Sequence, residues 1–347
     1  MSKNISFTDA LGQSSVGKRH LLLGNGFSRA CREDIFSYEA LLDQADFNKL
    51  SKNARKAFDI LKSTDFEIVM DALQKTSKLL KLYKGSSEII RSIENDAKGL
   101  REVLVTAIAQ NHPARPSEIL RKEYQACKLF LGNFQNGRIY TLNYDLLLYW
   151  ALMQDDISPD LTHDDGFRTA EEDEEEEGNE NDYVTWIDEK RYDQNIFYLH
   201  GALHIFDAGA ELKKYTWIRT GIPLIDQIRN ALENEMFPLI VSEGKSEEKL
   251  SKIRHSDYLS RGLKSLSEIR DSLFIFGHSL AKNDNHILKV IERGRIQHLY
   301  IGLYGNSDDP SNKRIISRAK LMQDYRKSKQ RSMEVSFYDA SSAHVWG

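Results

Sequence analysis

A short apolar run at residues 20–23 leads into Gly24-Asn25-Gly26-Phe27-Ser28, and this turn constrains the fold more than any other part of the chain. The apolar run predicts a buried strand. The two glycines let the backbone approach a bound group closely, and the N-terminus of a following helix favours a negatively charged group such as a phosphate. Arg29 and Ala30 occupy the positions where the third glycine of a dinucleotide-binding fingerprint would be sought. A strand-to-helix turn that binds no ligand is therefore the alternative interpretation.

Six further apolar runs predict the remaining strands of a sheet. In each run Ile, Leu, Val, Phe or Tyr residues follow one another instead of alternating with polar residues, which is typical of strands covered on both faces. Helical segments lie between the runs, so the sequence indicates an α/β fold: a Rossmann-like, doubly wound parallel sheet with helices on both faces. The six runs are residues 138–142, 196–199, 238–241, 273–276, 298–303 and 334–338.

The chain is predicted to contain a helical insertion. Residues 1–37 hold the first strand and the phosphate loop, residues 38–134 read as one helix after another, and residues 135–347 complete the Rossmann-like catalytic domain. A stretch as long as 38–134 is too long for a single crossover helix, which is why we interpret it as an inserted α-helical subdomain. Within it, Thr64-Asp65-Phe66-Glu67 has the spacing of a capping box, and Ser117 is predicted to cap a later helix.

An acidic segment near residues 155–182 is predicted to be a disordered loop. Its middle, Glu171-Glu172-Asp173-Glu174-Glu175-Glu176-Glu177, is a run of like charges that cannot pack into a core. An acidic strip that repels nucleic acid or docks a basic partner is the alternative.

The composition narrows the class of protein. Of the 347 residues, 40% are hydrophobic and 29% are charged, which fits a globular protein, and the formal net charge of −4 provides no general attraction for nucleic acid. Two cysteines, Cys31 and Cys127, are too few for a disulfide framework or a four-cysteine zinc site. The first 17 residues lack the pattern of a signal peptide, and no apolar run is long enough to cross a bilayer, so we expect a cytoplasmic location.

Small, polar and titratable residues follow several of the predicted strands. These are Thr141-Leu142-Asn143-Tyr144-Asp145, His200-Gly201 and Gly277-His278-Ser279-Leu280, in addition to the glycine turn after the first strand. In open α/β sheets ligands bind beyond the carboxyl ends of the strands. The recurrence of such residues at equivalent places therefore predicts a shared binding crevice.

Each of these residues also has a structural interpretation. Asn143 and Asp145 are both suited to capping the helix that begins near Leu146, and Asp284 is suited to capping the helix that follows it. His200 could be a core histidine bonded to a backbone carbonyl. His200 and His204 have a spacing found in metal sites, but Gly201 interrupts it and no acidic or third histidine ligand can be assigned, so no metal site is predicted.

Together these motifs resemble the NAD-binding catalytic domain of the sirtuin (silent information regulator) superfamily. The resemblance is strongest to the sirtuin-like NAD hydrolases of bacterial anti-phage defence. It rests on Gly24-Asn25-Gly26-Phe27-Ser28, Thr141-Leu142-Asn143-Tyr144-Asp145, His200-Gly201, and Gly277-His278-Ser279-Leu280 followed by Asp284, which occur in the family's order. Asn25 replaces the family's usual alanine, and the chain lacks the four zinc-binding cysteines of deacylating sirtuins.

The resemblance implies roles for these residues, with NAD as the substrate and no metal. Asn143 would orient the nicotinamide ribose and the attacking water, Asp145 would hold the carboxamide, and His200 would act as the base. Gly24, Gly26 and Ser28 would cradle the pyrophosphate, while Phe27 would shield the ribose. The other residues expected at the cofactor are Asn25, Thr141, Tyr144, Gly277, His278, Ser279 and Asp284, and residues 302–305 are a candidate for the adenine pocket.

The implied activity is cleavage of the nicotinamide–ribose bond of NAD, as the effector of an abortive-infection defence system. A non-catalytic module that senses NAD or ADP-ribose and an NAD-dependent protein deacylase are the alternatives. The resemblance also implies a homo-oligomer, with a HerA-type hexameric ATPase or another phage-sensing protein as partner. We expect neither direct nucleic-acid binding nor membrane association.

Overall fold

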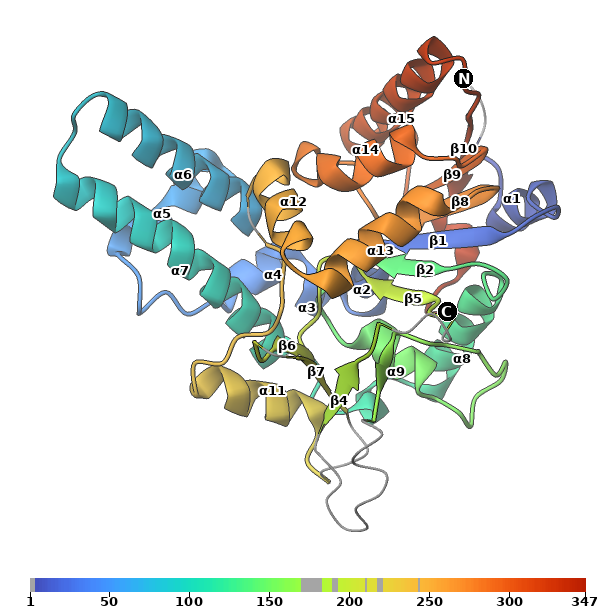
Figure 1. Ribbon diagram of the computed structural model, residues 1–347, viewed down its shortest axis with the longest axis horizontal. Helices are drawn as coiled ribbons and strands as arrows, with labels where there is room; N and C mark the ends of the chain where they lie inside the picture. Colours follow the sequence, from blue (N-terminus) through green and yellow to red (C-terminus); the bar gives the residue numbers. More distant parts are fainter. Residues whose placement is uncertain (1–3, 170–182, 189–192, 210, 217–220, 243) are drawn as a thin grey trace.

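The computed structural model describes residues 4–169, 183–188, 193–209, 211–216, 221–242 and 244–347. Within these residues, six strands form a parallel sheet in the order β10-β9-β8-β1-β2-β5 (Figure 1). The predicted α/β fold with a parallel sheet is confirmed. The strands are β1 (Arg19–Leu23), β2 (Ile139–Thr141), β5 (Ile196–Tyr198), β8 (Ser272–Phe276), β9 (His298–Leu303) and β10 (Glu334–Asp339).

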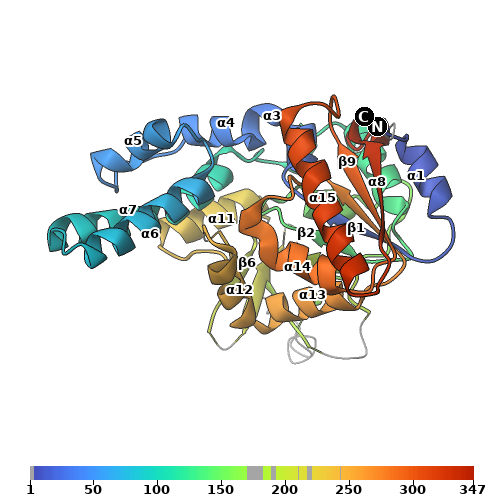
Figure 2. The ribbon, with the colours of Figure 1, turned by 90° about the horizontal axis from the view of Figure 1, so that it is seen from above.

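Both faces of the sheet are buried, as the continuous apolar runs require. Leu21 and Leu23 of β1 belong to one hydrophobic cluster, whereas Leu22 between them belongs to another. One face packs against α1 (Phe7–Gln13), α2 (Gly26–Cys31), α8 (Arg121–Gly132) and α9 (Leu147–Leu152). The other face packs against α13 (Asp257–Glu268), α14 (Asn285–Arg293) and α15 (Pro310–Ser328). Figure 2 shows this second group of helices along one side of the sheet.

Residues 38–134, all of which are described, form helices and no strand. The helices from this region are α4 (Tyr38–Asp43), α5 (Lys52–Leu61), α6 (Phe66–Leu82), α7 (Ser87–Asn111), η1 (Pro116–Glu118) and α8, and α3 (Glu33–Phe36) precedes them. Helices α5, α6 and α7 project away from the sheet in both views (Figures 1 and 2). Helix α8 instead packs on the sheet, where the Phe130 ring lies 5.4 Å from that of Phe276. The domain boundaries at 37 and 134 stay a prediction.

Two predicted helix caps were assigned to the wrong residue. Asp65, not Thr64, caps α6, because its carboxylate accepts hydrogen bonds from the backbone N–H groups of Glu67 and Ile68. The Glu67 side chain does not fold back to close a capping box and instead turns into the protein, where it meets a buried lysine. Ser117 lies inside η1, and α8 begins four residues later, at Arg121.

A second sheet was not predicted. It is antiparallel, in the order β3-β4-β7-β6, with strands β3 (Phe167–Arg168), β4 (Tyr183–Trp186), β6 (Ile205–Asp207) and β7 (Leu212–Tyr215). These strands, of two to four residues each, are too short to produce a recognisable apolar run. Conversely, the predicted strand at residues 238–241 is no strand of the main sheet: Ile240 makes only an isolated bridge to Gly201. The remaining elements are α11 (Leu224–Glu233), α12 (Ser246–Arg254), η2 (Lys282–Asp284) and η3 (Ala340–Ala343).

The segment predicted as a disordered loop begins with an ordered part. Up to residue 169 it forms turns and strand β3, and Asp165 makes a 2.5 Å ion pair with Lys214. The acidic run at 171–177 lies outside the described residues. Within the described part of the chain, no helix combines the length and apolarity that a bilayer-spanning segment needs.

Candidate active site

The candidate site lies where the strand order of the main sheet reverses. From β1 the chain continues to β2 and β5 on one side, and it later returns to build β8, β9 and β10 on the other side. The crevice at the carboxyl ends of the strands at such a reversal is the usual ligand site of open α/β sheets. A cavity of 440 Å³ lies here, within the range of about 300–1,000 Å³ that is typical of small-molecule sites. The predicted residues that line it are Gly24, Asn25, Gly26, Asn143, Tyr144, Asp145, His200, Gly277, His278, Ser279 and Asp284.

Three predicted residues are absent from the cavity wall: Phe27, Ser28 and Thr141. The ring of Phe27 is buried against Trp346, at a centroid distance of 5.2 Å, and its carbonyl oxygen accepts a hydrogen bond from the Trp346 indole. Phe27 therefore belongs to the core and does not shield a ribose. Ser28 and Thr141 lie behind the wall, where they hold the residues that do face the cavity.

The glycines at the strand ends allow two loops to touch. A Cβ on Gly26 would lie 2.5 Å from the Cα of Gly277, and Gly277 itself has a φ of +71°. The N–H of Gly24 donates to the carbonyl of Phe276, and the N–H of Gly26 donates to the carbonyl of Gly277. These two amides therefore already have partners within the protein, and the glycines allow the close packing of the two loops. Both glycines line the cavity, and their contact with a pyrophosphate stays a prediction.

We define the Asn143 corner as Ser28, Thr141, Asn143 and Asp145. The side-chain amide of Asn143 donates both protons, to the carbonyl of Gly24 at 3.1 Å and to the Ser28 hydroxyl at 2.8 Å. Its backbone N–H donates to the hydroxyl of Thr141. Because a carbonyl oxygen only accepts, the contact with Gly24 fixes which side-chain atom is the nitrogen. The Asn143 Oδ1 is thus the atom that can accept a hydrogen bond from a bound molecule.

Asp145 is held in the same corner. Its Oδ2 accepts from the Ser28 hydroxyl at 2.5 Å, and its Oδ1 accepts from the N–H of Leu147, the first residue of α9. The N-cap of this helix is Leu146. Burial raises the pKa of the Asp145 carboxyl, and the hydrogen bond from Ser28 opposes that rise. The adjoining turn is held by His112, whose Nε2 accepts from the N–H of Leu146.

The opposite wall carries charge, and we define the Lys249 corner as Glu67, Lys249, His278 and Asp284. The Lys249 ammonium lies 2.7 and 2.9 Å from the two carboxylate oxygens of Glu67, and 3.0 Å from Oδ1 of Asp284. Asp284 Oδ2 is 3.0 Å from His278 Nε2. His278 Nδ1 accepts from the N–H of Leu280, so the ring proton is on Nε2 and is donated to Asp284.

The pKa values of this corner follow from burial and charge. Burial raises the pKa of Glu67 to about 7, although Lys249 opposes the rise. Burial alone would also raise the pKa of Asp284, but the attraction of Lys249 and the hydrogen bond from His278 hold it well below its usual value. For Lys249, burial would lower the pKa, and the two carboxylates outweigh that effect and raise it.

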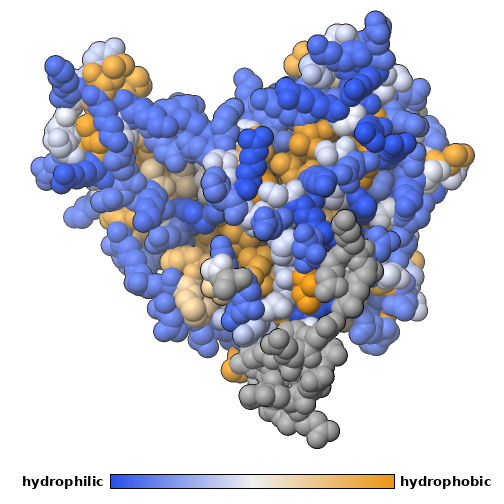
Figure 3. All heavy atoms as spheres, in the orientation of Figure 1, coloured by the Kyte–Doolittle hydropathy of each residue, from blue (hydrophilic) through white to orange (hydrophobic). Residues whose placement is uncertain are grey.

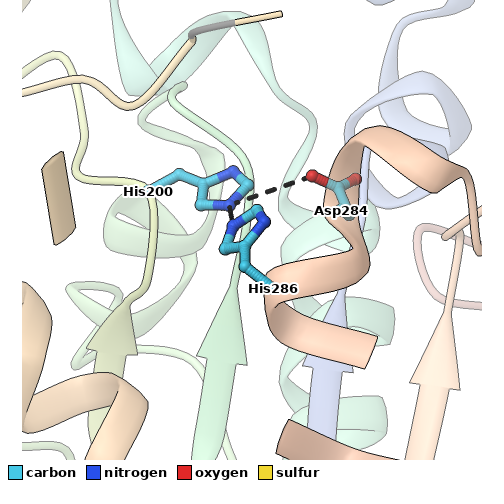
Figure 4. A group of neighbouring side chains, drawn as sticks. All are labelled: His200, Asp284 and His286. Atoms are coloured by element: carbon cyan, nitrogen blue, oxygen red, sulfur yellow. Dashed lines mark hydrogen bonds and ion pairs between the residues drawn. The ribbon is translucent and has the colours of Figure 1, made fainter. Parts of the chain in front are cut away.

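His200 lies between the two corners and forms a pair with His286 of α14. The Nε2 atoms of the two rings are 2.9 Å apart (Figure 4). One of the two Nε2 atoms donates a proton to the other, and in the tautomer in which His200 Nε2 donates, the lone pair of His200 lies on Nδ1, which points away from His286 in Figure 4. His286 Nδ1 lies 3.4 Å from the hydroxyl of Ser246. Burial lowers the pKa of His200 well below its ordinary value, with Lys249 acting in the same direction.

The comparisons with known proteins identify a family. Residues 21–346 match the family described as "Domain of unknown function (DUF4917)". The chain belongs to this family. No curated protein matches it. It is similar to a solved structure described as "Structural Basis for the Mechanism and Regulation of Sir2 Enzymes", with 10% identity, a TM-score of 0.35, and coverage of 95% of this chain and 100% of the other. A second, "The Structural basis of Sirtuin Substrate Affinity", has 15% identity, a TM-score of 0.35, and coverage of 92% and 97%.

Sequence reasoning missed three residues of the site in this DUF4917 chain: Glu67, Lys249 and His286. Glu67 and Lys249 occupy helical positions where charged residues are normally solvent-exposed, so nothing in the sequence marks them. His286 stands two residues after Asp284, and this spacing of an acidic residue and a histidine is the sequence feature that could have indicated that His286 belongs to the site. His200 has both an acidic neighbour, Asp284, and a second histidine, His286, which are ligand types that the sequence could not assign to it. His204 lies apart from them and packs between Tyr149 and Tyr198.

Proposed function

We propose that this protein is an NAD glycohydrolase that cleaves NAD to nicotinamide and ADP-ribose. The observation that carries the proposal is the convergence of Asn143, Asp145 and His200, from the ends of two strands, on one cavity at the reversal of the strand order. The resemblance of the same motifs to sirtuin-like NAD hydrolases supports the choice of NAD.

In the proposed reaction, the bond between the nicotinamide nitrogen and the ribose C1′ breaks, and a water oxygen bonds to C1′. The water proton is released, which balances the loss of positive charge from the nicotinamide ring. Asn143 Oδ1 is the acceptor that orients this water or the neighbouring ribose hydroxyl, since both of its amide protons are already donated. A rigid amide acceptor positions a water molecule without competing for its proton.

His200 is the proposed base. We propose the tautomer in which its Nε2 donates to His286 and its Nδ1 carries the lone pair, because a neutral ring with a free lone pair is the form that can accept a proton. Its lowered pKa keeps the ring neutral at physiological pH. We propose that Nδ1 accepts a proton from a ribose hydroxyl or from the attacking water.

The charge of the cavity suits a cationic transition state. Cleavage of the glycosidic bond places positive charge on the ribose, and Asp145, Asp284 and Glu67 line the cavity. Lys249 pairs with Glu67 and Asp284. Carboxylates fixed before the reaction stabilise such developing charge without reorganising. We propose that Asp145 also accepts a hydrogen bond from the nicotinamide carboxamide.

Nicotinamide release from NAD by the purified full-length protein tests the proposal. Asn143→Ala should lower the rate by at least about 100-fold, the effect typical of removing a positioned polar group. The matched control is Asn234→Ala at the exposed end of α11, which should keep the wild-type rate, and circular dichroism should show that both variants are folded. Equal rates for wild type and Asn143→Ala would overturn the proposal. Thermal stabilisation by NAD without nicotinamide release would favour the sensing alternative, and turnover only with acetylated peptide would favour a deacylase.

We further propose that NAD loss serves anti-phage defence and that the protein assembles into a homo-oligomer, with a sensor such as a HerA-type ATPase as partner. The surface that supports assembly is the end of the projecting helices. It exposes Leu79, Leu82, Tyr83 and Ile89, and Figure 3 shows apolar residues gathered there. Light scattering after size-exclusion chromatography tests this, and a monomer at micromolar concentration would contradict it.

A further inference from the structure

Three side chains with metal-binding atoms meet beside the cavity (Figure 4). They are His200, which follows β5, Asp284 at the end of η2, and His286 in the first turn of α14, and one ligand atom from each lies within 4.8 Å of the others. Two imidazoles and one carboxylate, from the end of β5 and from the start of α14, form a ligand set that zinc and similar ions use in proteins.

The distances fit a tetrahedral ion after small movements. With metal–ligand bonds of about 2.0–2.2 Å, ligand atoms around a tetrahedral ion lie about 3.3 Å apart. The Nε2 atoms of His200 and His286 are 2.9 Å apart, and His200 Nε2 lies 4.0 Å from Asp284 Oδ1. One distance is slightly shorter than ideal and the other slightly longer, so shifts of a few tenths of an ångström at each side chain would open the site.

The surroundings of His286 favour its role as a ligand. Its Nε2 lies 2.9 Å from His200 Nε2, and its Nδ1 lies 3.4 Å from the Ser246 hydroxyl on the other side of the ring. Outer hydrogen bonds of this kind orient metal-binding histidines.

Lys249 opposes metal binding at this site, because its ammonium contacts Asp284 Oδ1 at 3.0 Å and would be repelled by a cation. Lys249 has a second partner, since Glu67 holds it with both carboxylate oxygens at 2.7 and 2.9 Å. A metal ion could therefore displace Lys249 from Asp284 without leaving the ammonium unpaired. Asp284 Oδ2 would keep its hydrogen bond from His278.

We propose that His200, Asp284 and His286 form a binding site for a divalent transition-metal ion of the zinc type, with the cavity supplying a water molecule as the fourth ligand. This site and the base role of His200 exclude each other. A histidine that binds a metal through Nε2 carries its proton on Nδ1, so the metal removes the lone pair that the proposed hydrolysis needs. This consequence rests on the proposed function: the metal is an inhibitor of NAD cleavage.

Cobalt binding tests the site without reference to NAD. The full-length protein is freed of metal with EDTA, dialysed and titrated with CoCl₂ while visible absorption is recorded. The intense absorption of four-coordinate cobalt should appear and saturate at about one ion per chain, and ZnCl₂ should abolish it. Asp284→Asn and His286→Ala should each weaken binding by at least about 100-fold, because each removes a direct ligand. His255→Ala, at the exposed end of α12, is the matched control and should bind as wild type does.

Only weak octahedral absorption, or equal binding by wild type, Asp284→Asn and His286→Ala, would overturn the proposed metal site. Circular dichroism identifies any variant that has not folded. If His286→Ala does not fold, cobalt binding by Asp284→Asn, which keeps the size of the side chain, decides the test. A separate measurement adds ZnCl₂ to the NAD reaction, where nicotinamide release should fall as the site fills. Tetrahedral cobalt binding in a protein that never releases nicotinamide would contradict the proposed hydrolysis and leave the metal site standing.

Discussion

The two corners of the cavity are held together by different forces. In the Asn143 corner, polar side chains are fixed by hydroxyl, amide and carbonyl groups of the strand ends β1 and β2. In the Lys249 corner, opposite charges from α6, α12 and η2 balance one another in a buried environment. Removing one group from the Asn143 corner costs the stability of the hydrogen bonds that this group makes. Removing one charged group from the Lys249 corner leaves a buried charge without its partner, which costs more. The comparison indicates that the Asn143 corner holds polar groups in fixed positions. The Lys249 corner instead sets the electrostatic field in the cavity, which changes when one of its charges is changed.

The largest expected effect is on the charged corner. Lys249→Met leaves Glu67 and Asp284 as buried carboxylates without their cation, and we expect the free energy of unfolding at neutral pH to fall by about 3–5 kcal/mol. Urea denaturation measures the change. The double variant Glu67→Gln/Lys249→Met should recover part of the loss, because it removes one of the two unpaired charges. A Lys249→Met protein as stable as wild type would show that the two corners do not differ in this way.

A pH-dependent effect is expected beside the Asn143 corner. Burial lowers the pKa of His112 in the folded protein to about 4, whereas the unfolded chain has the ordinary value of 6.5. As the pH falls below 6.5, the unfolded chain binds the proton first, so the free energy of unfolding decreases by about 3 kcal/mol by pH 4. Above pH 7 the ring is neutral in both states, and this titration has no effect on stability. His112→Gln lacks this titration. The difference in unfolding free energy between wild type and His112→Gln should therefore become smaller as the pH falls from 7 to 4, as measured by urea denaturation. A difference that stays constant across that range would contradict the prediction.

The smallest effect is expected from Ser28→Ala. This change removes the hydroxyl that donates to Asp145 and accepts from Asn143, and it should cost about 1–3 kcal/mol of unfolding free energy. The exposed Ser328→Ala is the control and should change stability by less than about 0.5 kcal/mol. Because no net charge is unbalanced, the loss should be the same with or without Glu67→Gln. A loss that Glu67→Gln relieves would mean that the two corners are electrostatically linked.

The sequence predicted the strands of the main sheet because most of them are short apolar runs, such as residues 273–276, although the run at residues 238–241 gave a strand that the sheet lacks. It also predicted which strand ends form the cavity wall, since Asn143, Asp145 and His200 stand directly after strands β2 and β5. Those residues are placed by local geometry: a parallel strand delivers whatever follows it to one edge of the sheet.

The Lys249 corner could not be predicted in the same way. Glu67 and Lys249 are 182 residues apart, and the contact between Glu67 and Asn283 spans 216. Neither follows a strand or belongs to an apolar run, and only the folded structure brings Glu67 of α6 and Lys249 of α12 to within 2.7 Å of each other. The second sheet escaped prediction for a related reason, because strands of two to four residues carry too little pattern to be distinguished from loops.

The contact between the two glycine loops has a consequence for how the protein is made. The turn at Gly26 is complete only when Gly277 lies against it, and the carbonyl of Phe27 receives its indole donor from a residue 319 positions further along the chain. A ribosome must therefore synthesise nearly all of the described sequence before the first loop can adopt its final shape. Nascent chains and fragments that stop short of Trp346 lack that support, so in them the backbone of the first loop is left without the partner that holds it.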